Sequence, residues 1–231
     1  MSVFKFKYFN ITQERSSMKV GTDGVLLGSW VSCHKPDYIL DIGCGTGLLT
    51  LMLAQRNLES NIIGIEIDQI SSKEAQLNIR LSNWKARIEI INIPLQKFRT
   101  NKKFDLIVSN PPFFPPNNSN RRRDTARRTN ALSFQELVKY AANFLTDRGV
   151  LSVILPIVSE SIFVDIAQNH KLHCNRLCYI KGNSKAAIKR VMMEFSFTKS
   201  SCKEDCLIIE KSRSQYTDQY ISLCKDFYLK M

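Results

Sequence analysis

Five consecutive residues, Asn110-Pro111-Pro112-Phe113-Phe114, combine the groups that can hold a planar amino group. The side-chain oxygen of Asn110 can accept one hydrogen of such a group, and the backbone carbonyl of Pro111 can accept the other. Phe113 can stack on the ring that carries the amine. Pro111 and Pro112 stiffen the segment, so the acceptors are positioned in advance. The segment therefore predicts chemistry on the exocyclic nitrogen of a nucleobase or on a similar amide.

A second candidate site is the glycine-rich segment Asp41-Ile42-Gly43-Cys44-Gly45-Thr46-Gly47. Gly43, Gly45 and Gly47 allow the backbone to approach a ligand closely at the end of a strand. A dinucleotide site needs a third glycine at the spacing G-x-G-x-x-G, which this segment lacks. Asp41 favours a ligand that has a cationic centre and no pyrophosphate. S-adenosylmethionine fits, because it carries a sulfonium and an amino group.

A carboxylate for the ribose hydroxyls of this ligand is expected about 20 residues further along the chain. Glu66 stands there, at the end of an apolar run, and Asp68 could share or replace its role. A glycine-rich turn and an acidic residue at a strand end are each common in proteins, so neither of them alone is specific for this ligand. Together with the Asn-Pro-Pro-Phe segment, in this order, the features predict a site that joins a methyl donor to an amino acceptor.

These residues need strands that end at one edge of a sheet. Apolar runs alternate with amphipathic stretches between about residues 38 and 170, which predicts a mostly parallel sheet with helices on both faces. The expected strands are 38–42, 61–66, 88–91, 104–109 and 149–156, and the expected helices are 47–56, 69–83, 133–145 and 159–169. The runs 172–180 and 188–197 predict an antiparallel hairpin at the edge. The expected fold is α/β and Rossmann-like, with seven strands.

Composition limits the class of protein. With 231 residues, 44% of them hydrophobic, the chain can build one sizeable domain. No apolar stretch is long enough to span a membrane, and the N-terminus lacks the pattern of a signal peptide, so a cytoplasmic protein is expected. The seven cysteines are scattered and do not have the spacing of a zinc site, so no metal is expected.

The charge balance points to a polyanionic partner. The chain has 33 Lys and Arg against 21 Asp and Glu, a net charge of +12. Five arginines follow the Asn-Pro-Pro-Phe segment closely: Arg121, Arg122, Arg123, Arg127 and Arg128. A polar segment with this charge predicts contacts with RNA phosphates, although a solvated loop without such a role would have the same composition.

On these residues the chain resembles class I S-adenosylmethionine-dependent methyltransferases that act on amino groups. Asp41 to Gly47 is similar to their first motif, Glu66 to their ribose-binding acid, and Asn110 to Phe113 to their catalytic N-P-P-[FY] motif. The chain most resembles the bacterial tRNA1(Val) (adenine(37)-N6)-methyltransferases. The resemblance to this family also includes three further segments: Met18 to Gly28, the stretch 126–132 and the C-terminal segment 216–229. In total it covers about residues 4–229.

The resemblance implies methylation of adenine N6 in tRNA, at position 37 of the anticodon loop, with S-adenosylmethionine as the cofactor. It implies one methyltransferase domain over 1–231, in which residues 1–36 form a cap over the cofactor pocket and 37–231 form the core and a C-terminal extension. Within the cap, Lys19, Thr22 and Asp23 would border the cofactor. Neither a membrane nor an obligate protein partner is implied.

One position departs from the family pattern. Many relatives have an acid just after the third strand that contacts the cofactor adenine, whereas this chain has Ile93-Pro94-Leu95 there. Backbone groups or Asn92 are the expected substitutes.

Three other activities use related motifs. Guanine-N2 methylation of ribosomal RNA uses an N-P-P-F motif, often in a longer duplicated chain. Protein-glutamine N5-methylation usually needs a helical domain before the glycine loop, where this chain has only 40 residues. A DNA adenine enzyme would need an added target-recognition segment. The alternative without catalysis is an RNA-binding module on a decayed methyltransferase fold, which would not bind S-adenosylmethionine.

Overall fold

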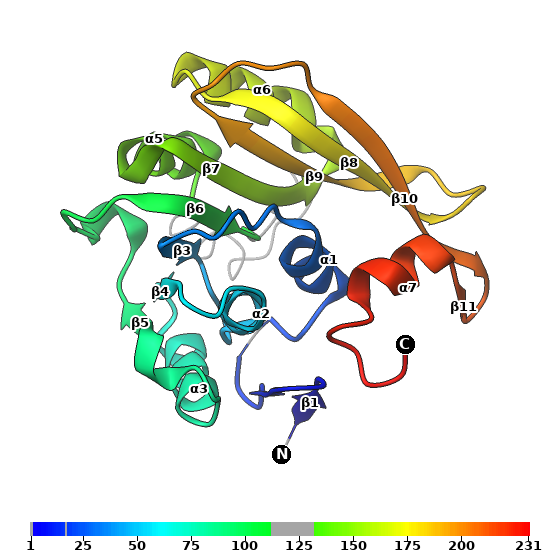
Figure 1. Cartoon of the computed structure of the whole chain (residues 1–231), viewed down its shortest axis with the longest axis horizontal. Coiled ribbons are helices and arrows are strands. Elements are labelled where there is room, and N and C mark those ends of the chain that lie inside the picture. Colours follow the sequence, from blue (N-terminus) through cyan, green and yellow to red (C-terminus); the bar gives the residue numbers. More distant parts are fainter. Residues whose placement is uncertain (1, 17, 112–131) are drawn as a thin grey trace, which may run out of the picture.

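A nine-stranded sheet lies between helices on both of its faces in the computed structural model, which describes residues 2–16, 18–111 and 132–231 (Figure 1). The strand order is β11-β10-β8-β9-β7-β6-β3-β4-β5. The central strands are β3 (Tyr38–Ile42), β4 (Asn61–Glu66), β5 (Ile88–Asn92), β6 (Phe104–Ser109) and β7 (Leu145–Pro156). These five strands are parallel, as predicted. Their apolar runs are explained by burial on both faces of the sheet.

The helices divide between the two faces. One core cluster joins the sheet to α1 (Thr22–Trp30), α2 (Leu48–Arg56), α3 (Gln69–Arg80) and α7 (Asp218–Cys224). The other joins it to α5 (Phe134–Phe144) and α6 (Glu160–Asn169). Short 3-10 turns at Lys85–Arg87, Leu95–Lys97 and Ile157–Ser159 connect elements. The predicted start of α5 is confirmed, because Ser133 and Glu136 form a capping box.

Strand β7 begins earlier than predicted, at Leu145 instead of Gly149. The sequence Asp147-Arg148-Gly149 suggested a turn, but the strand continues through it with a shift in register against β6. A side-chain carbon on Gly149 would lie 2.7 Å from the Phe104 carbonyl oxygen. The glycine therefore allows the two strands to approach closely at this irregularity, and it does not mark an end of the strand.

The C-terminal region confirms the predicted hairpin and extends the sheet beyond it. Strands β8 (His173–Asn183) and β9 (Ile188–Ser196) are antiparallel. The hairpin is not the edge, because β10 (Lys203–Ser212) pairs parallel to β8, and β11 (Gln215–Tyr216) pairs antiparallel to β10. The sheet is thus two strands wider than expected. The sequence of β10 does not show the apolar pattern of a strand, because only one of its residues, Leu207, is buried.

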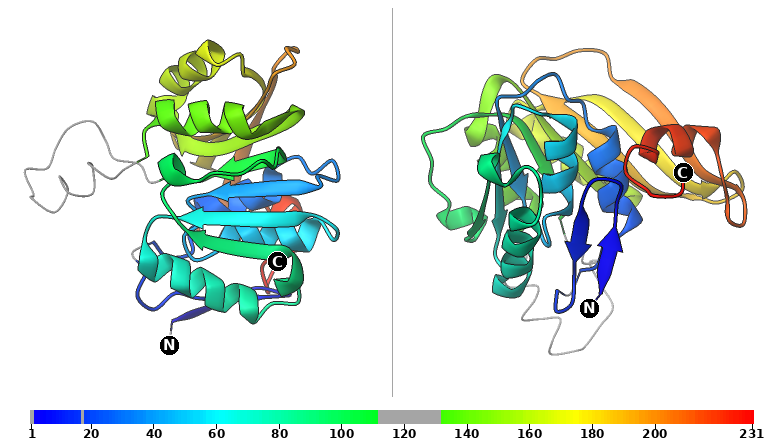
Figure 2. Two further views of the ribbon diagram at one scale, coloured as in Figure 1. Left: turned by 90° about the vertical axis from the view of Figure 1, so that its left-hand side faces the viewer. Right: turned by 60° about the horizontal axis from the view of Figure 1, so that its bottom comes forward.

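The N-terminal residues form a small sheet of their own, with strands β1 (Val3–Lys5) and β2 (Asn10–Thr12). Figure 2 shows this hairpin beside α3 and apart from the main sheet. The backbone of Thr12 donates to Asn78 Oδ1 at 2.9 Å, and Asn78 Nδ2 donates to the Thr12 carbonyl at 3.1 Å. These two bonds attach the hairpin to α3.

In the ranges that the structure describes, no helix has the length and apolar character needed to cross a membrane. The same ranges contain no group of three or more His, Cys, Asp and Glu residues that could hold a metal ion. The seven cysteines are free thiols.

Candidate active site

The predicted site residues Asp41, Glu66 and Asn110 come together at one edge of the sheet. They lie at or just after the carboxyl ends of β3, β4 and β6, and β3 is the central strand of the three. Ile42 of β3 pairs with Ile65 on one side and with Ser109 on the other. Ligands of open α/β sheets bind at this edge, so the topology makes it the candidate active site.

The glycine loop has the backbone conformation that its sequence predicted. Gly43, Gly45 and Gly47 have φ angles of +73°, +57° and +86°, which residues with a side chain rarely adopt. The amides of Gly43 and Cys44 both donate to the Ile65 carbonyl, at 2.9 and 3.0 Å. Among the described residues, a side-chain carbon on Gly43 or Gly45 would meet no atom within 4 Å. The loop therefore leaves open space beside its backbone.

Glu66 fastens this loop to the end of β4. Its Oε2 accepts from the Gly45 amide and its Oε1 from the Asp68 amide, both at 2.8 Å. The side chain is nearly buried, and burial raises its pKa above the usual value for glutamate. Each carboxylate oxygen can accept a second hydrogen bond, so Glu66 has acceptors left for the hydroxyls of a ribose.

Asp68 and Asn92 support the turn that follows Glu66. Asp68 Oδ2 accepts from Ser71, from its amide at 2.8 Å and from its hydroxyl at 2.7 Å, and so caps α3. Asn92 Nδ2 donates to the carbonyls of Glu66 and Ile67, at 2.8 and 3.1 Å. These contacts give both residues a positioning role next to Glu66.

Asp41 is fully buried, and only one of its two carboxylate oxygens accepts a hydrogen bond from the described residues. Oδ2 accepts from the Thr50 hydroxyl at 2.6 Å, whereas Oδ1 is buried without a hydrogen-bond partner in the described part of the chain. Burial raises the pKa of Asp41 to about 7. A buried oxygen without a partner is costly in a folded protein, and such atoms are expected where a ligand or water completes the site.

Asn110 also has a buried side-chain oxygen, Oδ1, without a hydrogen-bond partner among the described residues. This residue directly follows β6. The end of β6 is fixed to β3, because the Ser109 hydroxyl donates to the Ile42 carbonyl at 2.8 Å. Pro111 is buried. The predicted residues Pro112, Phe113 and Phe114 and the five arginines lie outside the described residues.

The N-terminal tract reaches the same edge through α1. A side-chain carbon on Gly24 would lie 2.9 Å from Leu48 Cδ2 and 3.9 Å from Asn110 Nδ2. Of the predicted cofactor contacts, Lys19 donates to the Gln13 and Glu14 carbonyls. Asp23 pairs with Arg190 Nε at 2.8 Å, and Thr22 is exposed at the start of α1. Lys19 and Asp23 thus hold neighbouring segments of the protein itself.

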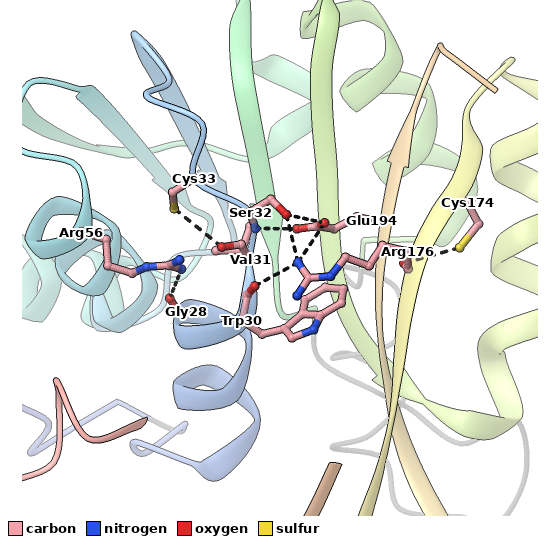
Figure 3. A network of polar contacts seen from close by, with 9 residues as sticks. All are labelled: Gly28, Trp30, Val31, Ser32, Cys33, Arg56, Cys174, Arg176 and Glu194. Carbon is pink, nitrogen blue, oxygen red and sulfur yellow. Dashed lines mark hydrogen bonds and ion pairs between the residues drawn. The ribbon is translucent and has the colours of Figure 1, made fainter. Parts of the chain in front are cut away.

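A network of polar contacts fixes the other end of α1 to the sheet (Figure 3). Glu194 is buried in β9 and accepts from the Ser32 amide and hydroxyl at 2.6 and 2.8 Å. Arg176 Nη1 donates to Glu194 at 3.3 Å and to the Trp30 carbonyl at 3.2 Å, and its guanidinium lies 4.0 Å from the centre of the Trp30 ring. The network joins the C-terminal end of α1 to β8 and β9, while Gly24 near the start of the same helix lies close to Asn110.

Sequence reasoning missed Gly24, Thr50 and Arg190. Gly24 lies in the first turn of α1, and a glycine inside a helix is a local signal of close packing. The contacts of Thr50 with Asp41 and of Arg190 with Asp23 had none, because they join different elements.

Comparisons with known proteins show the family of the chain. The family model of the methyltransferase small domain matches residues 17–160. A tRNA1(Val) (adenine(37)-N6)-methyltransferase from Flavobacterium psychrophilum is 42% identical over 99% of this chain and 100% of its own. One of the same name from Trichodesmium erythraeum is 43% identical over 98% of each chain.

Solved structures share the fold. A predicted O-methyltransferase from Agrobacterium tumefaciens superposes with a TM-score of 0.70 over 89% of this chain and 96% of its own, at 17% identity. A ribosomal protein L11 methylase from Lactobacillus delbrueckii subsp. bulgaricus gives 0.54 over 75% and 76%, at 16% identity. The fold is therefore that of a class I methyltransferase, and by its near full-length relatives the chain belongs to the family of tRNA1(Val) (adenine(37)-N6)-methyltransferases.

Proposed function

We propose that the protein transfers a methyl group from S-adenosylmethionine to the exocyclic N6 of adenine in tRNA, at position 37 of tRNA1(Val). The observation that carries the proposal is the buried, unpartnered Oδ1 of Asn110 beside the open glycine loop. The name of the curated relatives supports the choice of tRNA and of the base. A tRNA substrate also favours the cytoplasm as the place of action.

The residues at the glycine loop fit the proposed cofactor. Asp41 Oδ1 offers an acceptor for the amino group, Glu66 has free lone pairs for the ribose, and the backbone beside Gly43 and Gly45 is open. When bound, S-adenosylmethionine supplies an electrophilic methyl group. Residues 1–36 would act as the cap over this pocket, since α1 lies against Leu48 and next to Asn110. Asn92 stands next to Glu66, where it could replace the missing adenine-binding acid.

Asn110 would activate the acceptor nitrogen by its position. The lone pair of adenine N6 is delocalised into the ring, which makes the nitrogen a poor nucleophile. Asn110 Oδ1 and the Pro111 carbonyl would accept its two hydrogens and draw them out of the ring plane, so that the lone pair turns towards the methyl group. No strong base is needed before transfer, because the nitrogen becomes positively charged and loses its proton afterwards, to solvent.

Two further groups of residues complete the proposal. Phe113 would stack on the target base, which must leave its stack and does so more readily in a loop than in a duplex. Arg121, Arg122, Arg123, Arg127 and Arg128 would contact tRNA phosphates, in line with the net charge of +12.

Substitution of Asn110 tests the proposal. Asn110→Ala is expected to lower the rate of N6-methyladenosine formation in total bacterial tRNA by about 100-fold or more, because one of two acceptors at the reacting nitrogen is lost. Its affinity for S-adenosylmethionine, measured by calorimetry, should stay within about two-fold of wild type. Asn61→Ala is the matched control, since Asn61 is exposed at the opposite end of β4.

Nucleoside analysis of the labelled products separates the alternatives. N2-methylguanosine or labelled protein as the product of the wild-type enzyme would replace this proposal with one of the related activities. Near-normal turnover by Asn110→Ala would contradict the proposed role of Asn110. Absence of S-adenosylmethionine binding to the wild type would favour the non-catalytic RNA-binding module.

A further inference from the structure

The turn that joins β8 to β9 carries a concentration of positive charge. This hairpin tip, defined as residues 181–190, contains Lys181, Lys185, Lys189 and Arg190. No acidic residue occurs in the sequence between Asp165 and Glu194. The predicted RNA contacts were all placed after the Asn-Pro-Pro-Phe segment, so this second basic surface is not included in them.

Strand register places the hairpin tip at the same edge of the sheet as the candidate active site. Ser109 pairs with Val153, Val153 with Met193, and Pro156 at the end of β7 with Arg190. Two strand spacings and three residues of advance put Arg190 roughly 15 Å from Ser109. The tip continues outward from there, and Figure 1 shows it projecting to the right, past β10.

The base of the hairpin tip is joined to the site through α1. Arg190 Nε pairs with Asp23 Oδ2 at 2.8 Å, and the next residue, Gly24, lies against Asn110. The turn itself is held by internal bonds. Lys181 Nζ donates to the Ser184 carbonyl at 2.9 Å, and Asn183 Oδ1 accepts from the Lys185 amide at 3.0 Å.

Lys185 and Lys189 are the charges left for a partner. Both side chains are exposed, and within the described ranges neither ammonium group makes a hydrogen bond or an ion pair. An ordered turn that displays two unpaired ammonium groups beside a base-modifying site is suited to phosphates, which attract lysine as a point charge. Charge placed there contributes to affinity without reading the sequence of the RNA.

We propose that the hairpin tip binds backbone phosphates of the tRNA while the target base occupies the active site. The proposal rests on the proposed function, since it takes tRNA as the substrate. It adds a docking surface, formed by Lys185 and Lys189 on the hairpin between β8 and β9, that helps to orient the bound RNA.

The test is charge reversal with a matched control. Lys185→Glu/Lys189→Glu is compared with Lys199→Glu/Lys203→Glu. This control reverses two exposed lysines at the opposite edge of the sheet, where β9 ends and β10 begins. Binding of unmodified bacterial tRNA is measured by filter retention over a series of salt concentrations. Steady-state methylation and S-adenosylmethionine affinity are measured on the same preparations.

The hairpin variant should weaken tRNA binding by about ten-fold or more and raise the KM for tRNA, with kcat and cofactor affinity close to wild type. Lys185→Ala/Lys189→Ala should make the slope of log affinity against log salt shallower by about two. The control variant Lys199→Glu/Lys203→Glu should change neither the KM for tRNA nor this slope. Equal tRNA affinity in the hairpin and control variants, with a wild type that methylates tRNA, overturns the hairpin proposal alone. A wild type that does not bind tRNA overturns both proposals.

Discussion

Asp41 and Asn110 each bury a side-chain oxygen for which residues 2–16, 18–111 and 132–231 supply no hydrogen-bond partner. Neither arrangement helps the protein to fold, since an unpaired buried acceptor lowers stability. Both atoms lie where adjacent strands end, on β3 and after β6. Under the proposed function, both oxygens are acceptors that are in position before a ligand binds, at a cost in stability to the ligand-free protein.

The raised pKa of Asp41 makes the stability of the ligand-free protein depend on pH. Its pKa is about 7 in the folded protein, against 3.8 for an unperturbed aspartate. The folded state thus binds the proton more tightly, so the contribution of Asp41 to stability is present below about pH 4 and is lost as the pH rises to about 7. Asp41→Asn removes the ionisation, and should raise the free energy of unfolding at pH 8 by about 2 kcal/mol.

Urea denaturation without cofactor, at several pH values, measures this effect. The difference between Asp41→Asn and wild type should shrink as the pH is lowered towards 5. A difference that does not change with pH would contradict the assignment of an ionisable, buried Asp41.

At the scale of elements, α1 is the piece that connects the site to the C-terminal half of the sheet. Its start pairs with β9 through Asp23 and Arg190, and the segment after its end is held by Glu194 and Arg176. A helix held at both ends presents Gly24 to Asn110 in a fixed position.

Removal of Glu194 should loosen this attachment. Glu194→Ala leaves the Ser32 amide without its acceptor and Arg176 without its carboxylate, and should lower the free energy of unfolding by about 2 kcal/mol. The expected loss in free energy of unfolding is modest, because the Arg176 side chain is 35% exposed and solvent screens its charge. Lys211→Ala, which breaks the exposed pair with Asp218, is the control and should change stability by less than about 0.5 kcal/mol.

Urea denaturation at one pH compares the two variants. Equal and small effects would show that the Glu194 network does not contribute to stability. A loss of turnover in Glu194→Ala beyond the loss of folded protein would support its role in placing α1.

At the scale of the whole molecule, the net charge of +12 should dominate the response to salt. With about six phosphate contacts, tRNA affinity is expected to fall about 1,000-fold between roughly 50 and 200 mM salt. Binding releases counterions from the RNA, and their release is less favourable when the salt concentration in solution is higher. S-adenosylmethionine affinity should change little over the same range. Fluorescence anisotropy with labelled tRNA measures the slope, and a flat response would contradict electrostatic binding of RNA.

The order of strands and helices from β3 to β9 could be predicted because each element carries its own hydrophobic period and end signals. Strand β10 could not, because it buries only Leu207 and its place is decided by pairing with β8. The glycine loop was predictable for a different reason, since the left-handed angles at Gly43, Gly45 and Gly47 are local requirements.

The sequence by itself determined that Asp41, Glu66 and Asn110 stand at strand ends in a parallel sheet, and therefore share one edge. Only the tertiary structure decided what surrounds them: the hydroxyl of Thr50 on Asp41, Gly24 against Asn110, and the ion pair of Asp23 with Arg190, 167 residues apart. Local patterns encode the conformation of a segment and the direction of its side chains. Contacts between distant segments depend on how whole elements pack, so they leave no signal in either segment alone.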